Sequence, residues 1–341
     1  MSLLSFFLAF LISLALTPLT IWLGPRLGVA DAPGGRRQHH GIISRMGGVA
    51  LFGGFMSTGL LIFTRSPSIV GTHDYPLLLG VMVGAVFVFI FGLADDFFEF
   101  PPWPQYVAQL GAAFIAIYYT IFIKHVTFPF LGEVVFPWFI TYPLTIFWVM
   151  GMINTVNFLD GLDGLAAGVT AIAAFLFAWH AYKIGQKTVY LFPLALAGAC
   201  LGFLIFNFSP AKVFMGSAGS FTLGWALASL SILAPAKVAT ALLVLGIPIL
   251  DVAWLIVRRW REKGSPMISG RDHLHYRLLD LGFSQRTIVL GYYAFCFTFG
   301  LLALLISSRV YKLVALLVLT SFTLLLLWQL AKMKNQQASR R

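Results

Sequence analysis

The run LLLGVMVGAVFVFIFGLA, residues 77–94, contains no charged side chain and is followed directly by Asp95 and Asp96. As an α-helix, an apolar run of roughly 17 to 25 residues crosses the ~30 Å hydrocarbon core of a bilayer. Similar runs recur along the chain, 59% of whose 341 residues are hydrophobic and only 10% charged. Since a soluble chain carries about a quarter charged residues, the sequence predicts an all-α, polytopic integral membrane helix bundle.

About eleven transmembrane helices are expected from these runs. They lie near residues 3–23, 47–64, 75–94, 104–122, 136–153, 164–182, 188–206, 218–233, 237–256, 287–307 and 311–331. The first run lacks the charged start and the small-residue cleavage site of a signal peptide, so we expect a retained helix. No tract resembles a soluble domain, and residues 1–341 are therefore expected to form one integral-membrane domain.

The basic residues predict how the bundle is oriented. With the N-terminus outside and the C-terminus in the cytoplasm, 16 of the 23 Lys and Arg residues fall on the cytoplasmic side. The main cytoplasmic loops are then 24–46, 95–103, 154–163, 207–217 and 257–286. The net charge of +11 suits anionic partners such as lipid or nucleotide. Nucleic acid is not an expected partner, because the basic residues are spread over membrane-proximal loops.

Two acidic motifs lie on this cytoplasmic side. Asp95 and Asp96 are adjacent carboxylates, which repel each other unless a divalent cation or a cationic partner compensates them. A solvated helix end is the alternative interpretation. The second motif spaces its polar residues three apart, so that a helix would align them as one stripe, and it consists of Asn154, Asn157, Asp160 and Asp163. A helix cap explains one of these residues, but not all four.

Basic and histidine side chains on the same side suit phosphate oxygens. They are Arg36, His39 and Arg45 in the first loop, Lys212 before the eighth span, and His273, His275 and Arg277 in the longest loop. Ordinary positive-inside loops are the alternative interpretation. Small residues around Gly216 and Ser217 favour either an anion site at a helix N-terminus or a helix-packing face. The histidines project to one side if the loop is extended, and a zinc pair is disfavoured because no Cys accompanies them.

Together, these segments resemble the polyprenyl-phosphate N-acetylhexosamine-1-phosphate transferase family, integral membrane enzymes that begin cell-envelope glycan assembly. The resemblance runs from about Asp31 to Tyr292, with the motifs in the family's order. It is carried by Asp95-Asp96, Asn154-x-x-Asn157-x-x-Asp160-Gly-x-Asp163-Gly, Pro210-Ala-Lys212-x-Phe-Met-Gly216, His273-Leu-His275-x-Arg277-Leu-Leu and the loop from Asp31 to Gly48. The His-Leu-His form and the short fifth loop resemble the bacterial undecaprenyl-phosphate branch that uses UDP-N-acetylglucosamine.

Three positions depart from the family pattern. Ser217 stands where the family usually has an Asp that binds magnesium, and a hydroxyl is a poorer Mg²⁺ ligand than a carboxylate. Either this chain naturally places the metal elsewhere, or the family's Asp has been replaced to trap an inactive form. Because the site is one carboxylate short of the family pattern, we expect the protein as it stands to be weakly active or inactive and to bind Mg²⁺ poorly. Tyr276 replaces the last histidine of the usual His-x-His-His run. Ile42-Ile43-Ser44 replaces the common Pro-Ile-Pro.

The resemblance implies transfer of N-acetylglucosamine-1-phosphate from a UDP-sugar to undecaprenyl phosphate, with release of UMP, at the cytoplasmic face of the bacterial inner membrane. Mg²⁺ is the implied cofactor, with Mn²⁺ as an alternative, and its implied ligands are Asn157 and the residue at position 217. The implied catalytic residues are Asp95, Asp96, Asp160, Asp163 and His273. The implied substrate-binding residues are Arg36, His39, Arg45, Asn154, Lys212, His275 and Arg277. A homodimer is compatible with the sequence.

Two other functions remain open from the residues alone. An Asp-rich membrane prenyltransferase would need a second Asp-rich motif like Asp95-Asp96, whereas this chain has the Asn/Asp stripe and the histidine loop. A lipid or drug transporter would show inverted repeats and charges near mid-membrane. The sequence shows no repeat, and its charges gather on one side.

Overall fold

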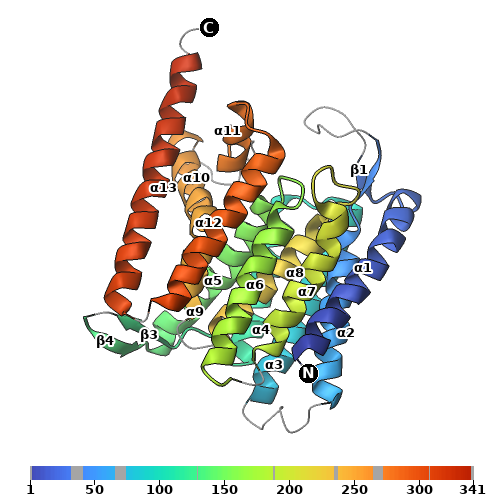
Figure 1. Cartoon of the computed structure of the whole chain (residues 1–341), viewed down its shortest axis with the longest axis horizontal. Coiled ribbons are helices and arrows are strands. Elements are labelled where there is room, and N and C mark those ends of the chain that lie inside the picture. Colours follow the sequence, from blue (N-terminus) through green and yellow to red (C-terminus); the bar gives the residue numbers. More distant parts are fainter. Residues whose placement is uncertain are drawn as a thin grey trace.

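The computed structural model describes residues 2–31, 41–65, 74–128, 130–186, 189–233, 237–263, 272–306 and 308–338. Helices dominate this part of the chain (Figure 1). They are α1 (Ser2–Arg26), α2 (Gly47–Arg65), α3 (Asp74–Phe98), α4 (Pro102–Tyr118), α5 (Trp138–Leu159), α6 (Leu165–Lys183), α7 (Leu191–Asn207), α8 (Gly216–Leu233), α9 (Lys237–Val244), α10 (Gly246–Lys263), α11 (Leu274–Asp280), α12 (Gln285–Leu305) and α13 (Arg309–Ala338). Two antiparallel strand pairs join β1 (Ala30–Asp31) to β2 (Ile43–Ser44) and β3 (His125–Phe128) to β4 (Gly132–Val135).

The all-α, polytopic architecture is confirmed. Within the described residues, eight helices are long and apolar enough to cross a membrane, and α7 is apolar but shorter. Each of the eleven predicted spans coincides with helix, although the ninth is divided into α9 and α10 around Leu245. Pro248 explains this break, because it has no N–H to donate and its ring clashes with the carbonyl of Val244 four residues earlier. The number eleven and the orientation of the termini remain predictions.

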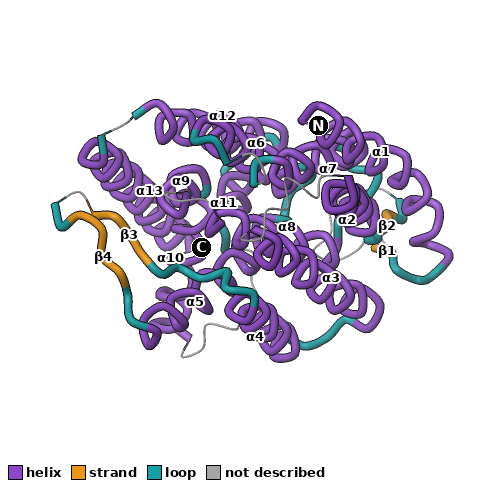
Figure 2. Tube along the Cα trace, turned by 90° about the horizontal axis from the view of Figure 1, so that it is seen from below, coloured by secondary structure: helices purple, strands orange, loops and turns teal. Residues whose placement is uncertain are grey.

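Helix α8 lies in the interior of the bundle. Viewed along the helices in Figure 2, it runs between α3 and α6, and it packs on α2, α3 and α5. Close packing against α3 depends on Gly84, where an added Cβ would lie 2.0 Å from the Trp225 ring. The indole of Trp225 also donates a hydrogen bond to the carbonyl of Val81 over 2.8 Å. Helix α8 is therefore fixed in register with α3.

The N-terminal helix packs along α7 and α2. Its buried side chains are small and recur about every four residues: Ser5, Ala9, Ser13, Thr17, Thr20 and Gly24. Between membrane helices, small residues allow the backbones to approach, which provides van der Waals contact without a hydrophobic driving force. On the facing helix α7, the contact residue Gly198 is also small. A Cβ at this position would lie 2.2 Å from the carbonyl oxygen of Phe6 on α1.

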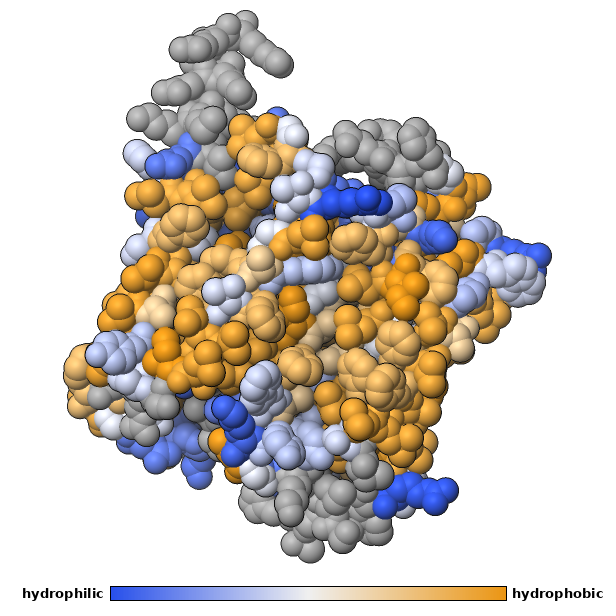
Figure 3. Space-filling model, viewed as in Figure 1, coloured by the Kyte–Doolittle hydropathy of each residue, from blue (hydrophilic) through white to orange (hydrophobic). Residues whose placement is uncertain are grey.

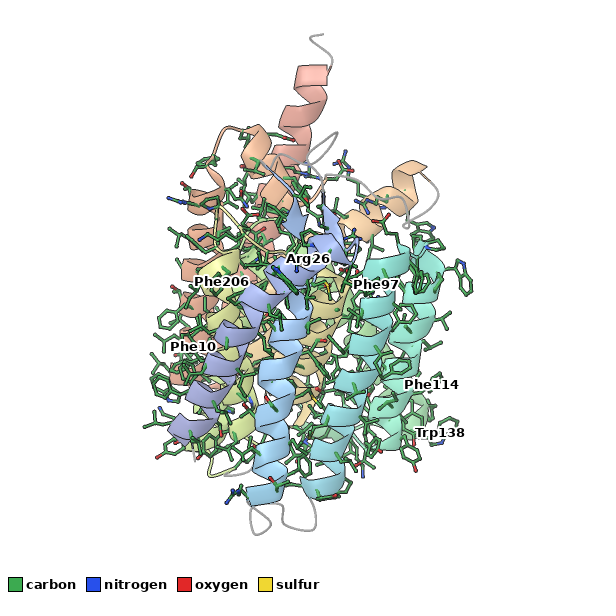
Figure 4. All side chains as sticks on the ribbon, turned by 90° about the vertical axis from the view of Figure 1, so that its right-hand side faces the viewer. Phe10, Arg26, Phe97, Phe114, Trp138 and Phe206 are labelled. Carbon is green, nitrogen blue, oxygen red and sulfur yellow. The ribbon has the colours of Figure 1, made fainter. Side chains whose placement is uncertain are left out.

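The outer surface of the bundle is apolar. Figure 3 shows hydrophobic side chains covering the middle of the face in view, and hydrophilic ones nearer its two ends. Phe114 and Trp138, labelled in Figure 4, project outward and are exposed. One end of the molecule carries α11 and the β1–β2 pair, and the other carries β3–β4 and the N-terminus (Figure 1). This distribution fits a bundle enclosed by lipid, with two different polar ends.

Candidate active site

The C-terminal end of α3 meets the N-terminal end of α8. Both carboxylate oxygens of Asp96 accept backbone hydrogen bonds, from Ser217 N at 2.7 Å and from Ala218 N at 3.0 Å. The first N–H groups of a helix have no partner within the helix and carry partial positive charge, so a carboxylate there is stabilising. Asp96 is 4% exposed. It therefore acts as the N-terminal cap of α8, supplied by a different helix.

Asp95 has different partners. Its Oδ2 accepts a hydrogen bond from the Ser217 hydroxyl at 2.5 Å, and its Oδ1 accepts one from Gln105 Nε2 of α4 at 3.0 Å. Both donors are neutral side-chain groups that a ligand can displace without unwinding a helix. Of the two carboxylates, Asp95 is the one whose oxygens are available for ligand chemistry.

A compact turn brings α8 to this position. Gly216 has a φ of 66°, and a Cβ there would lie 2.4 Å from the Arg45 carbonyl oxygen and 2.5 Å from Asp96 Oδ2. Arg45 donates from Nη2 to the carbonyl of Asp96 at 2.8 Å and from Nη1 to Glu99 Oε1 at 2.9 Å. The Arg45 guanidinium thus ties the first loop to the end of α3. Its phosphate-binding role stays a prediction.

The Asn/Asp motif begins on a helix and leaves it. Helix α5 ends at Leu159, so only Asn154 and Asn157 lie on regular helix, and Asp160 is its C-terminal cap. Asn154 Nδ2 donates to Gln109 Oε1 of α4 at 2.5 Å, whereas Asn157 Oδ1 accepts from Ser220 Oγ of α8 at 2.9 Å. The first half of the motif thereby connects α5 to two neighbouring helices.

The second half of the motif lies in the turn between α5 and α6. Asp163 Oδ2 accepts a hydrogen bond from Ala211 N at 3.0 Å, in the segment that leads into α8. Lys212, in the same segment, is exposed. Burial raises the pKa of the Asp160 carboxyl well above its usual value, and the negative charges of Asp96 and Asp163 raise it further. Asp160 therefore lies close enough to the carboxylates of Asp96 and Asp163 to be repelled by both, and a bound cation would relieve that repulsion.

The histidine loop folds against the same turn. His273 stacks on Phe158 of α5, with 5.0 Å between ring centroids, and on His275, with 5.6 Å. His275 covers Gly161, where a Cβ would lie 2.5 Å from its Nε2. His273 is the N-cap residue of α11 and has an extended backbone, whereas His275 lies in the first turn of the helix, so the two do not share an extended segment. Arg277 Nε donates to the carbonyl of Asp272 at 2.8 Å.

Several site residues were not expected from the sequence. Gln105 and Gln109 lie four apart on α4 and reach the acidic motifs, and their polarity within an apolar run was the available signal. Asp251 contacts His273 from within α10, and an acid in an apolar span was again the signal. Arg36 and His39, which were predicted to bind substrate, lie outside the described residues.

Comparison with known proteins identifies the family. Residues 78–235 match the model of glycosyl transferase family 4. The chain is 32% identical over 314 residues to the probable undecaprenyl-phosphate N-acetylglucosaminyl 1-phosphate transferase of Bacillus subtilis, covering 89% of this chain and 84% of that protein. It is 32% identical over 299 residues to the decaprenyl-phosphate N-acetylglucosaminephosphotransferase of Mycobacterium tuberculosis, covering 80% of this chain and 74% of that protein.

A third relative is similar to this chain over a comparable length. It is the undecaprenyl-phosphate alpha-N-acetylglucosaminyl 1-phosphate transferase of Yersinia pestis, which is 29% identical over 294 residues and covers 81% of this chain and 76% of that protein. Identity of about one third over most of two chains of similar length reflects a shared fold and a shared set of motifs. The chain belongs to the polyprenyl-phosphate N-acetylhexosamine-1-phosphate transferase family and is a transferase.

Proposed function

We propose that this protein transfers N-acetylglucosamine-1-phosphate from UDP-N-acetylglucosamine to undecaprenyl phosphate and releases UMP. The names of the relatives support the sugar phosphate and the lipid acceptor. The observation that carries the proposal is the group of carboxylates around the start of α8, where Asp95 is held, among the residues that the structure describes, only by the neutral groups of Ser217 and Gln105. The donor, the cytoplasmic location of this end and the bacterial inner membrane belong to the same proposal.

Magnesium suits the groups at this end of the bundle. Mg²⁺ prefers oxygen ligands, keeps several waters, and is commonly held by one or two carboxylates together with substrate phosphates. Within the described residues, no three His, Cys, Asp or Glu side chains come together as a metal cluster. The nearby oxygen donors are instead Asp95, Ser217 and Asn157. Burial raises the pKa of the Asp160 carboxyl, and the neighbouring charges of Asp96 and Asp163 raise it further, so a cation in this region would be stabilising. The three oxygen donors would hold Mg²⁺, with Mn²⁺ as an alternative; when bound, it neutralises the diphosphate.

The reaction forms one bond and breaks one. A lipid phosphate oxygen attacks the β-phosphorus of the UDP-sugar, and the bond from that phosphorus to the bridging oxygen breaks, so that UMP leaves with the electron pair. The second pKa of a phosphate monoester is about 6, so the acceptor is mostly ionised at neutral pH and needs little help from a base. We therefore assign Asp95 to orienting the lipid phosphate. Asp96 is unsuited as a covalent nucleophile, because both its oxygens hold the N-terminus of α8.

The remaining predicted residues would bind the donor. His273 and His275 lie against the turn that carries Asp160 and Asp163, so we assign them to the phosphate oxygens. Arg45, Lys212 and Arg277 would add positive charge around the diphosphate, as would Arg36 and His39. Asp160 and Asp163 would bind the nucleotide or organise the site, and Asn154 would also bind substrate. The two substrates are both anionic and repel each other. These cations lower that repulsion and so favour the approach of one substrate to the other.

One assay tests the whole assignment. The purified protein is incubated with undecaprenyl phosphate, Mg²⁺ and one of several UDP-sugars, and both UMP and the lipid-linked product are measured. We expect product with UDP-N-acetylglucosamine, at a low rate for the chain as it stands and a higher rate for Ser217→Asp. Absence of UMP from both proteins with every UDP-sugar would refute the proposal. Release of pyrophosphate from a prenyl diphosphate would favour a prenyltransferase instead.

A further inference from the structure

Asp251 on α10 is a buried carboxylate to which none of the roles above applies. It is 3% exposed, and a buried charge is costly unless it is paired and hydrogen-bonded. Both of its oxygens have a partner on the histidine loop. Oδ2 lies 2.9 Å from His273 Nδ1, and Oδ1 accepts a hydrogen bond from Leu274 N at 3.0 Å.

We propose that Asp251 is a positioning residue, which fixes the orientation and the tautomer of His273 for the transferase reaction. The inference rests on the proposed function insofar as His273 binds a phosphate oxygen there. The contacts of Asp251 do not depend on that function. Its single carboxylate binds both the ring nitrogen Nδ1 of His273 and the first backbone N–H of α11. His273 supplies no cap from its own side chain, so Asp251 also performs the capping of this helix.

Contacts on the faces of the His273 ring also restrict its orientation. The imidazole of His273 stacks on Phe158 and on His275, which limits its rotation about the Cβ–Cγ bond. With Nδ1 engaged by Asp251, Nε2 is the remaining polar atom of the ring. In the part of the chain that the structure describes, Nε2 makes no hydrogen bond. Phe158 belongs to the same segment as Asn157 and Asp160, so the fixed ring lies beside the acidic motif.

A carboxylate on Nδ1 determines what Nε2 can do. Because a carboxylate can only accept, Nδ1 must carry a proton, as in metal sites where a second carboxylate orients a histidine ligand. Nε2 then offers a lone pair in the neutral ring, or an N–H to a phosphate oxygen when the ring carries both protons. In the second state, the charge of Asp251 balances that of the ring. The other neutral tautomer would leave two lone pairs facing each other on Nδ1 and the carboxylate.

Histidine tautomers can be read by NMR without any assay of activity. The full-length protein is labelled with ¹⁵N-histidine in detergent at about pH 8.5, above the usual histidine pKa of about 6.5, and His273 is assigned by the loss of its signals in His273→Gln. A proton on Nδ1, alone or together with one on Nε2, supports the proposal. A proton on Nε2 alone overturns it. In Asp251→Asn, the amide keeps the acceptor for Leu274 N and donates to Nδ1, so we expect the proton to move to Nε2.

Kinetics then test whether Asp251 acts through His273. We expect Asp251→Asn to lower kcat for UMP release by about 10–100-fold, the usual range for a residue that orients a functional group. In the His273→Gln background, the same substitution should cost less than about twofold, since the residue it positions is gone. Asp280→Asn, at the exposed end of α11, is the matched control and should retain parental activity.

The outcomes separate the two proposals. Equal losses from Asp251→Asn in the parental and His273→Gln backgrounds would overturn the positioning role. Absence of UMP release by the parental protein and by Ser217→Asp would instead refute the proposed function, while the tautomer of His273 would still decide the role of Asp251. If Asp251→Asn fails to fold, the NMR measurement on the parental protein remains decisive.

Discussion

The hydroxyl of Ser217 donates a hydrogen bond to Oδ2 of Asp95 across 2.5 Å. An Asp at position 217 would bring a second carboxylate against Asp95, and the two charges would repel unless a cation lay between them. The serine therefore keeps this contact neutral. It leaves the chain one carboxylate short of the family pattern at the point where a metal would bind.

We predict that Ser217→Asp creates a strong dependence on magnesium. UMP release should rise by orders of magnitude at millimolar Mg²⁺, and without metal the variant should be less stable than its parent, because the carboxylate pair is then uncompensated. The measurement is the rate of UMP release, and separately the Tm, across a magnesium titration. Equal rates and equal magnesium dependence of the two proteins would place the metal away from position 217.

The two adjacent carboxylates should respond differently to neutralisation. Asp96→Asn loses one charged acceptor at the start of α8, so we expect a loss of about 1–3 kcal/mol of stability. Asp95→Asn can still accept from Ser217, and Gln105 can turn its amide to match, so it should retain its Tm while losing activity. Thermal unfolding and UMP release of both variants provide the comparison. A stable Asp96→Asn protein would contradict the capping role.

Neutralising Asp160 should raise the stability of the protein and lower its activity. Its raised pKa means that the folded protein holds a proton more tightly there than the unfolded chain does. The bound proton therefore stabilises the folded protein at low pH. This stabilisation is lost as the pH rises from the pKa of Asp160 in the unfolded chain towards its higher pKa in the folded protein. Asp160→Asn removes the cost of ionisation, so at pH 7 without metal we expect its Tm to rise by at least about 2 °C.

The same substitution should cut turnover by at least roughly a hundredfold, the scale for losing a positioned electrostatic group. Asp163→Asn should lose activity to a similar extent, but without the gain in stability, because Asp163 accepts a hydrogen bond from Ala211. If Asp160→Asn, shown monodisperse in detergent, kept the rate of an active parent, Asp160 would not belong to the site.

A methyl group at Gly161 should disturb the histidines. In Gly161→Ala, the new Cβ would lie 2.5 Å from Nε2 of His275 and 2.7 Å from the Tyr276 hydroxyl, so the loop must move. A displacement of about 1 Å can cost a hundredfold in rate, and we expect a loss of at least tenfold in UMP release. Gly151→Ala is the matched control, since nothing lies within 4 Å of a Cβ there. Equal activity of the two variants would separate the histidine loop from catalysis.

Topology is tested by labelling from outside the cell. Single cysteines introduced at Gly35 and Ile268 are expected in the cytoplasm, because 16 of the 23 basic residues lie on that side in the predicted orientation. They should resist a membrane-impermeant maleimide in intact cells and react after permeabilisation. The native Cys200 and Cys296 are buried and give little background. Labelling of either cysteine in intact cells would contradict the predicted orientation and indicate the opposite one.

The fold was predictable because it depends on local composition. Each apolar run had to form a helix in order to pair its backbone groups within lipid, and each predicted span coincides with helix. The division of the ninth span at Leu245 was missed, although Pro248 signalled it. The precise partners within the site were less predictable. The sequence indicated that Asp95 and Asp96 belong together, but their separate roles depend on Ser217 and Ala218, more than a hundred residues away.

Asp251 illustrates the same limit. Its apolar surroundings marked it as unusual, yet only the approach of α11 to α10 reveals its partner, His273. Gln105 and Gln109 carry no charge, and their part in the hydrogen-bond network depends on the packing of α4 against α3 and α5. Periodicity within one segment predicts that segment's own structure, whereas contacts between segments depend on packing.

The meeting of α3 and α8 also sets the order in which the site is completed during synthesis. Asp95 precedes Ser217 by 122 residues. At about 5–20 residues per second, α8 leaves the ribosome roughly 6–24 s after α3. During that interval, the nascent chain has two adjacent carboxylates at the end of an inserted helix and lacks the N–H groups that later hold Asp96. A chain arrested before residue 216 would therefore form a partial bundle in which Asp96 lacks the backbone N–H groups of Ser217 and Ala218, whereas Gln105 could already donate to Asp95.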